Sequence, residues 1–166
     1  MADSYQLWMS HDVAESIRRH GAETFPYECC GALLGRESAA TEDNGSQQQQ
    51  IELPREILEL FPLVNRRDDS PRNRFAVTAE DVREAEKAAS QHGLEVVGWY
   101  HSHPDHPARP SAFDREHAWP WYSYVIVSVE AGTSKDLTSW RLEDDRSKFE
   151  AEEVLPVRAA SHGKQG

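Results

Sequence analysis

The sequence predicts an α/β or α+β fold, in which helices pack on the faces of a mixed β-sheet. Two patterns predict it. Short apolar or alternating segments, typical of strands, are interleaved with a few amphipathic helices, and several predicted strands follow one another over short connections. A length of 166 residues, of which 38% are hydrophobic, suits one domain with one core.

The first part of the chain predicts a strand, a helix and a second strand. Residues 5–9 alternate apolar and polar side chains, as a short strand does. Ser10 then offers an N-cap oxygen to a helix that we expect to run to His20 and to stop at Gly21. The apolar segment 28–35 is framed by turn-forming residues and predicts a buried strand.

The next stretch gives weaker signals. Residues 38–50 include four consecutive glutamines and have nothing to bury, so they predict a mobile loop. Residues 51–64 are compatible with one or two helical turns within a connecting segment. Residues 66–74 are polar and charged, and they predict a second exposed loop.

The second half of the chain has clearer boundaries. Thr78 and Asp81 form a capping pattern at the start of a helix over residues 79–92, which Gly93 stops. The remaining predicted elements are a strand at 94–103, a helix from Ser111 to about Trp119, a strand at 124–129, and an antiparallel pair at 137–142 and 149–157. We expect residues 158–166 to be a flexible tail, which leaves residues 1–157 as the single domain.

Composition narrows the class of partner and the compartment. Lys and Arg total 18 against 29 Asp and Glu, and the net charge of -11 repels phosphate backbones and anionic lipids. We therefore expect neither nucleic acid nor a membrane as partner. Cys29 and Cys30 are adjacent and cannot form a disulfide framework, and no apolar run is long enough to span a bilayer. These features predict a soluble, cytoplasmic protein.

One short stretch carries the chemistry. His101 and His103 are two residues apart on a predicted strand, so both imidazoles point to the same face. The proline-rich segment 104–110 ends the strand, and the helix opened by Ser111 can bring Asp114 back toward the histidines. Two imidazoles and one carboxylate leave a fourth tetrahedral position for water, which is the pattern of a catalytic zinc site.

Ser111 and Asp114 also have a purely structural interpretation. Ser-x-x-Asp at the start of a helix is a capping arrangement in which both side chains serve backbone N–H groups. We expect the two roles to compete, because an Asp114 that caps the helix would be a poorer ligand. The histidine pair upstream favours the metal-ligand role for Asp114 over the capping role.

The same residues carry a resemblance to a known family. The pattern His-Ser-His-Pro, seven residues, Ser, two residues, Asp over 101–114 resembles the JAMM motif of the MPN-domain metallopeptidases. Residues 26–35, Pro-Tyr-Glu-Cys-Cys-Gly-Ala-Leu-Leu-Gly, resemble the family's glutamate segment, and Leu-Val-Asn at 63–65 is similar to a further conserved stretch. The resemblance spans roughly residues 5–155 and is strongest with the small, stand-alone prokaryotic members.

The resemblance implies a fold, a cofactor and an activity. The fold would be cytidine-deaminase-like, with a curved mixed sheet flanked by helices. One Zn²⁺ per chain would be held by His101, His103 and Asp114, with Glu28 as general base and Ser111 stabilising the oxyanion. The reaction would be hydrolysis of a peptide or isopeptide bond after the C-terminal glycine of a ubiquitin-like or sulfur-carrier protein ending in Gly-Gly. The substrate tail would add as a strand near residues 65–75 or 119–123.

Other residues near the motif have simpler interpretations. We expect Cys30 to be a packing residue and His106 and His117 to be solvated. The remaining aromatic residues are expected to fill the core or to support the loop: Trp99, Trp119, Trp121 and Tyr122.

Three rival functions remain to be weighed. A catalytically silent MPN-type scaffold that binds a ubiquitin-like partner would normally lack a ligand, and none is missing here. A zinc deaminase would need His-x-Glu and a later Pro-Cys-x-x-Cys, which the sequence does not contain. A cysteine peptidase would use Cys29 or Cys30 with a histidine. The sequence is compatible with a homodimer.

Overall fold

A computed structural model describes residues 5–37, 54–64 and 77–156. The expected loops at 38–50 and 66–74 and the expected tail at 158–166 lie outside these residues. Across the described residues, seven strands and three helices follow one another as β1 (Tyr5–Met9), α1 (His11–Thr24), β2 (Cys30–Glu37), β3 (Arg55–Leu63), α2 (Ala79–Gln91), β4 (Glu95–Pro104), α3 (Ala112–His117), β5 (Ser123–Glu130), β6 (Thr133–Leu142) and β7 (Phe149–Leu155). Within the described ranges, no helix is long and apolar enough to cross a membrane.

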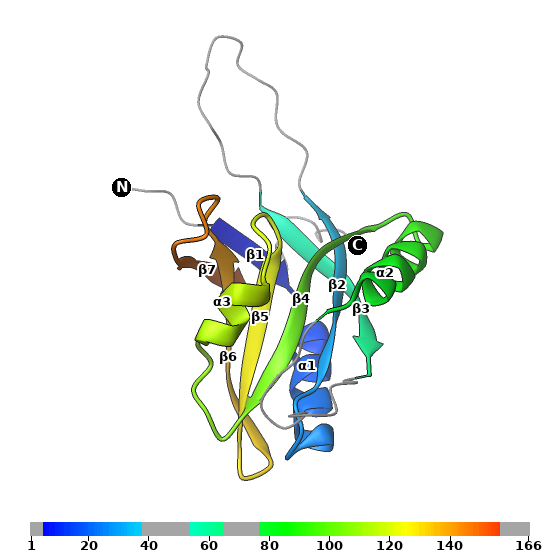
Figure 1. Ribbon diagram of the computed structural model, residues 1–166. Helices are drawn as coiled ribbons and strands as arrows, with labels where there is room; N and C mark the ends of the chain where they lie inside the picture. The colour runs from blue at the N-terminus through cyan, green and yellow to red at the C-terminus, as the bar shows by residue number, and fades with distance from the viewer. Residues whose placement is uncertain (1–4, 38–53, 65–76, 157–166) are drawn as a thin grey trace.

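The strands form a closed, mixed barrel in the order β1-β3-β2-β4-β5-β6-β7 (Figure 1). The parallel pairs are β1 with β3, β1 with β7, and β4 with β5, while the others are antiparallel. The predicted mixed, curved sheet with flanking helices is confirmed. Pairing of β1 with β7 closes the barrel between the first and the last strand, and local sequence patterns do not specify this pairing.

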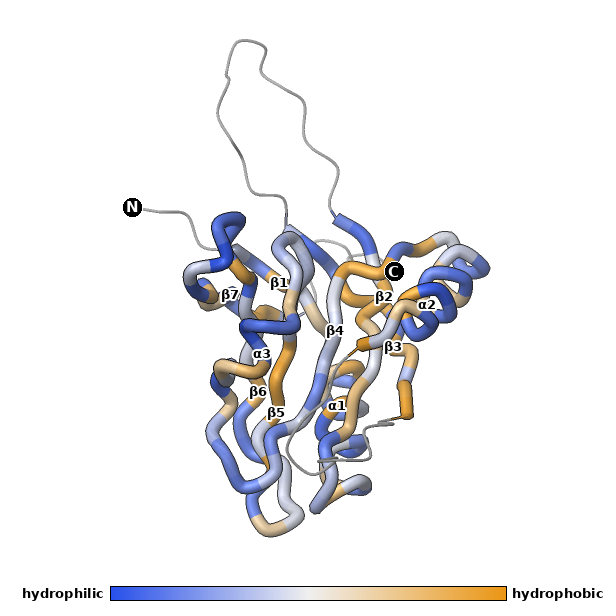
Figure 2. Tube along the Cα trace, in the orientation of Figure 1, coloured by the Kyte–Doolittle hydropathy of each residue, from blue (hydrophilic) through white to orange (hydrophobic). Residues whose placement is uncertain are grey.

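Two apolar clusters pack the helices onto opposite faces of the sheet. Ile17 of α1 packs with one cluster, which includes Val97 and Tyr100 of β4. Ala85 of α2 packs with the other cluster, which includes Trp99 of the same strand. Figure 2 shows a strongly hydrophobic β5 and a mixture of hydrophilic and hydrophobic residues along α2, as expected of a helix with one buried face. The core therefore lies on both sides of β4, the strand that carries the paired histidines.

The prediction for the end of the first helix was wrong. The helix begins after Ser10, whose hydroxyl accepts the N–H of Val13 at 3.1 Å, but it continues past Gly21 to Thr24. Gly21 is buried inside the helix, and a Cβ there would lie 3.1 Å from Cγ2 of Val129. The glycine provides a close approach between α1 and β5 and does not stop the helix.

The segment 51–64 also differs from its prediction. It contains strand β3 in place of one or two helical turns, because the strand pairs with β2 over eight register positions and with the end of β1. Helix α3 is shorter than predicted and ends at His117. Helix α2 begins at a capping box of Thr78 and Asp81, as predicted.

Candidate active site

Strand β4 presents two buried imidazoles to one point. His101 and His103 are 4% and 8% exposed, and their Nε2 atoms lie 3.2 Å apart. His103 is held in place by a 2.8 Å contact between its Nδ1 atom and the carbonyl oxygen of Pro107. Because a carbonyl can only accept, Nδ1 carries a proton, and Nε2 is the ring nitrogen that faces His101 and Asp114.

Helix α3 brings a carboxylate to the same point. Oδ1 of Asp114 lies 3.3 Å from Nε2 of His101, and Oδ2 lies 3.2 Å from Nε2 of His103. Oδ2 also accepts the N–H of Ser111 at 2.8 Å, and the Ser111 hydroxyl accepts the N–H of Asp114 at 3.0 Å. Asp114 thus closes the capping box while its carboxylate faces both imidazoles, because its two oxygens have enough lone pairs for these contacts together.

The three side chains fit a tetrahedral zinc ion. A zinc ion with ligand distances of about 2.0–2.2 Å separates neighbouring ligand atoms by about 3.3 Å. The two Nε2 atoms lie 3.2 Å apart, Oδ1 of Asp114 is 3.3 Å from His101 and Oδ2 is 3.2 Å from His103, so one ligand atom from each residue lies within 4.8 Å of the other two. Within the part of the chain that the structure describes, His101, His103 and Asp114 are the one group of three or more His, Cys, Asp or Glu side chains close enough to share an ion.

The charge of Asp114 is matched to this role. Burial by itself would raise the pKa of Asp114, but the adjacent His101 and hydrogen bonds from the two imidazoles outweigh it. Together with the backbone N–H of Ser111, they hold the pKa well below its usual range. Asp114 is therefore an anion at neutral pH, as a metal ligand must be.

Glu28 lies beside the triad, just before β2. It is 5% exposed, and burial, together with the negative charge of Asp114, raises its pKa to about 9. With His103 and Ser111 it lines a cavity of about 300 Å³, whose other walls are His106, Pro107 and Arg109. A buried glutamate, one of the two candidate ligand histidines and a serine thus line one space.

Pairing between β2 and β4 explains why Glu28 reaches this position. Cys30 is opposite His101 in the antiparallel register. The N–H of Cys29 donates to the hydroxyl of Ser102 at 2.8 Å, and the N–H of Ser102 donates to the carbonyl of Cys29 at 3.2 Å. Ser102, which the sequence analysis did not single out, therefore attaches the glutamate segment to the histidine strand. Its position between two same-face histidines could have indicated a contact on the opposite face.

Several residues around the site behave as expected and others do not. Cys30 and Trp99 are fully buried packing residues, and His106 and His117 are exposed. Of the two roles expected for Trp119 and Trp121, filling the core does not apply, because they are 45% and 44% exposed. Trp119 lines a small hollow next to His101 and Asp114, and Trp121 stacks on the guanidinium of Arg55 at 4.1 Å.

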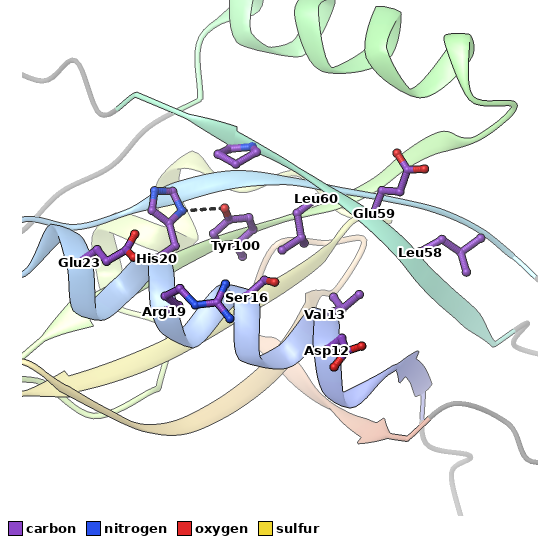
Figure 3. Close-up of a pocket in the computed structure, with 11 residues that line it drawn as sticks. Asp12, Val13, Ser16, Arg19, His20, Glu23, Leu58, Glu59, Leu60 and Tyr100 are labelled. Atoms are coloured by element: carbon purple, nitrogen blue, oxygen red, sulfur yellow. Dashed lines mark hydrogen bonds between the residues drawn. The ribbon is translucent and has the colours of Figure 1, made fainter.

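A larger groove of about 580 Å³ lies elsewhere, between α1 and β3 (Figure 3). On its floor, Nδ1 of His20 is 2.8 Å from the hydroxyl of Tyr100, and burial lowers the pKa of His20. Tyr100 and His101 are consecutive in β4, so their side chains project from opposite faces of the strand. The groove is therefore separated by the sheet from the His101–His103–Asp114 triad.

The fold and the site are those of a metallopeptidase: a mixed barrel brings two imidazoles and a carboxylate close enough to share one ion, with a buried carboxyl beside them. Comparison with known proteins leads to the same class. Residues 10–143 match the family model described as prokaryotic homologs of the JAB domain. The chain belongs to this family, and the resemblance to the JAMM and MPN proteins is confirmed. It is accordingly a hydrolase of the metallopeptidase class.

Two curated relatives cover most of the chain. It is 32% identical over 132 residues to the desampylase of Haloferax volcanii, across 76% of this chain and 84% of the relative. It is 28% identical over 124 residues to the probable TtuB-protein conjugate cleaving protease of Thermus thermophilus, across 75% of this chain and 71% of the relative.

Solved structures agree on the fold. A protein from Salinibacter ruber is 42% identical with a TM-score of 0.66, and the match covers 92% of each chain. A JAB1/MPN domain protein from Archaeoglobus fulgidus is 17% identical with a TM-score of 0.50, over 89% of this chain and 98% of the other. The second likeness concerns the fold alone.

Proposed function

We propose that this chain is a zinc-dependent peptidase or isopeptidase that cleaves after the C-terminal glycine of a ubiquitin-like or sulfur-carrier protein. The observation that carries the proposal is the convergence of His101, His103 and Asp114, whose ligand atoms all lie within 4.8 Å of one another, beside the buried carboxyl of Glu28. The names of the two relatives, a desampylase and a TtuB-conjugate protease, support this class of substrate.

His101, His103 and Asp114 would hold the ion. When bound, zinc supplies Lewis acidity that polarises a carbonyl and makes a water molecule acidic near neutral pH. The three protein ligands leave one tetrahedral position open, as catalytic zinc sites do. The Pro107 carbonyl fixes the orientation of the His103 ring, and the Ser111 N–H does the same for the carboxylate of Asp114.

Glu28 would move the proton. Its carboxyl is buried beside the triad, and burial raises its pKa to about 9 before any cation is considered. A dication held by the three ligands would favour the carboxylate and bring that pKa down toward the working pH. Glu28 then accepts the proton of the attacking water and returns it to the leaving amine, acting first as general base and then as general acid.

Ser111 would stabilise charge on the scissile carbonyl oxygen. Its hydroxyl oxygen accepts the N–H of Asp114, and this contact leaves the O–H proton to donate. Ser111 lines the same cavity as Glu28. A donor of this kind contributes about 2.7–4 kcal/mol in comparable oxyanion sites.

The test combines metal analysis with turnover. The probes are TtuB joined through its C-terminal glycine to a lysine side chain, and the same protein extended by one amino acid at its C-terminus. We expect one zinc per chain, cleavage of at least one probe, loss of cleavage with a chelator, and recovery with added zinc. Glu28→Gln should keep the zinc and lose activity by about 100-fold or more.

Glu23→Gln is the matched control, because Glu23 is an exposed glutamate that lines the other groove. It should keep full activity. Well under one zinc per chain would favour the silent scaffold, and full activity in Glu28→Gln would exclude Glu28 as the base. Loss of turnover on thiol alkylation, with no effect of a chelator, would favour the cysteine peptidase.

A further inference from the structure

Helix α3 carries the proposed ligand Asp114, and it is short and has no fully buried residue. It contains six residues, none of them buried, and it carries Asp114. Isolated helices shorter than about 12–15 residues are marginal in water. Its amino end is fixed by the Ser111–Asp114 capping box, whose carboxylate is also a ligand. The carboxyl end of α3 must therefore be fixed by another part of the molecule.

Arg146 makes that attachment. It lies in the turn between β6 and β7, which runs beside α3 (Figure 1). One terminal nitrogen of its guanidinium donates to the carbonyl of Ala118 at 2.7 Å. The other donates to the carbonyls of Arg115 and Glu116 at 3.2 and 3.3 Å. A cation thus satisfies three carbonyls at the end of α3 where the helix dipole is negative.

The turn that presents Arg146 is itself well defined. Arg146 has φ of 64°, a left-handed conformation uncommon for residues other than glycine. Its N–H donates to the carbonyl of Glu143 at 2.8 Å, and the N–H of Ser147 donates to the carboxylate of Asp145 at 2.9 Å. Because β6 and β7 are barrel strands, the Arg146 side chain ties α3 to the barrel.

We propose that Arg146 is a positioning residue for the metal centre. It does not contact the triad, and it acts by holding the carboxyl end of α3 so that Asp114 stays against His101 and His103. The inference rests on the proposed zinc site. Only arginine, with its planar set of donors, can reach the carbonyls of Ala118, Arg115 and Glu116 at once.

The test uses two substitutions and a matched control. Arg146→Gly removes the side chain at a left-handed position that glycine adopts without strain. Arg146→Lys keeps the positive charge but loses the planar set of guanidinium N–H donors. Lys148→Ala removes a positive charge from the same turn, where Lys148 pairs with Glu150 and not with α3. Zinc affinity is measured by competition with a chelating dye, and hydrogen exchange of α3 and β5 amides is measured in metal-free protein.

We expect Arg146→Gly to weaken zinc binding about tenfold or more, the usual effect of losing a partner that orients a ligand. The α3 amides should exchange faster while β5 amides keep their protection. Arg146→Lys should fall between parent and Arg146→Gly, and Lys148→Ala should match the parent.

Two results would overturn the inference. The first is a zinc affinity of Arg146→Gly that lies within twofold of the affinity of Lys148→Ala. The second is an equal loss of hydrogen-exchange protection in α3 and β5, because that would indicate a general loss of stability. Failure of the proposed function is distinguishable. In that case the parent itself would bind no stoichiometric zinc, while faster α3 exchange in Arg146→Gly would still be seen.

Discussion

Ser102 and Cys29 are joined by two hydrogen bonds, one from the N–H of Cys29 to the Ser102 hydroxyl at 2.8 Å and one from the N–H of Ser102 to the Cys29 carbonyl at 3.2 Å. Ser102 lies between the two ligand histidines, and Cys29 follows Glu28. The pair therefore sets the position of the Glu28 carboxyl, the proposed general base, relative to the two histidines.

The Ser102→Ala variant should lose activity without losing zinc. The buried N–H of Cys29 would have no acceptor, which costs about 1–3 kcal/mol, and Glu28 would no longer be held in register. Ser128→Ala is the control, because the buried Ser128 hydroxyl accepts the N–H of Asp136 at 3.0 Å, far from Glu28 in the sequence. Chemical denaturation should show similar losses for both, whereas turnover should fall only in Ser102→Ala. Equal turnover in the two variants would contradict the positioning role.

The stability of metal-free protein should fall as pH rises from about 4.5 to 9. The folded-state pKa of Glu28 is about 9 against an ordinary value of 4.5, so in this window the folded chain holds a proton that the unfolded chain has released. Deprotonation therefore favours unfolding. Denaturation with a chelator present, repeated at several pH values, measures the slope.

Glu28→Gln should flatten that slope, since the amide does not titrate. Asp114 affects the stability of the protein in a different pH range. Its pKa is lowered in the folded state, so its contribution is present above its ordinary pKa of 3.8 and is lost only as pH falls below it. An unchanged slope in Glu28→Gln would show that other groups cause the pH dependence.

The Asp114→Asn variant should keep α3 and lose the metal. The amide oxygen can still accept the Ser111 N–H, but a neutral amide is a weak zinc ligand. Asp81→Asn is the matched control, because Asp81 closes the equivalent capping box with Thr78 on α2. Zinc titration should show binding weakened by about 100-fold or more in the first variant and unchanged in the second. Comparable zinc binding in the two variants would mean that Asp114 caps helix α3 and does not bind the metal.

Gly98→Ala should strongly destabilise the barrel. A Cβ at this position would lie 2.1 Å from the backbone carbonyl oxygen of Ser123, so β4 and β5 would have to separate locally. We expect a loss of about 3 kcal/mol or more in the free energy of unfolding. Gly93→Ala is the control, since Gly93 has open space around it and only its φ of 70° is strained. It should cost about 1–2 kcal/mol.

Local patterns predicted much of the fold and the candidate metal ligands. The capping box at Thr78 and the same-face spacing of His101 and His103 depend on neighbours within a few residues, so they can be read from one segment. Strand β3 was missed because its hydrogen bonds go to β1 and β2, whose pairing the segment does not encode. Gly21 was misread because its close neighbour, Val129, is distant in the chain.

The sequence by itself determined the donor set, His101, His103 and Asp114, because strand and helix periodicity fix which side chains share a face. Glu28 was found only through its resemblance to a known glutamate segment, since no spacing connects it to the histidines. Tertiary structure alone decided that Ser102 fixes Cys29 beside β4 and that Arg146 holds the end of α3. These contacts join segments far apart in the chain, and they form only when barrel closure brings the strands together.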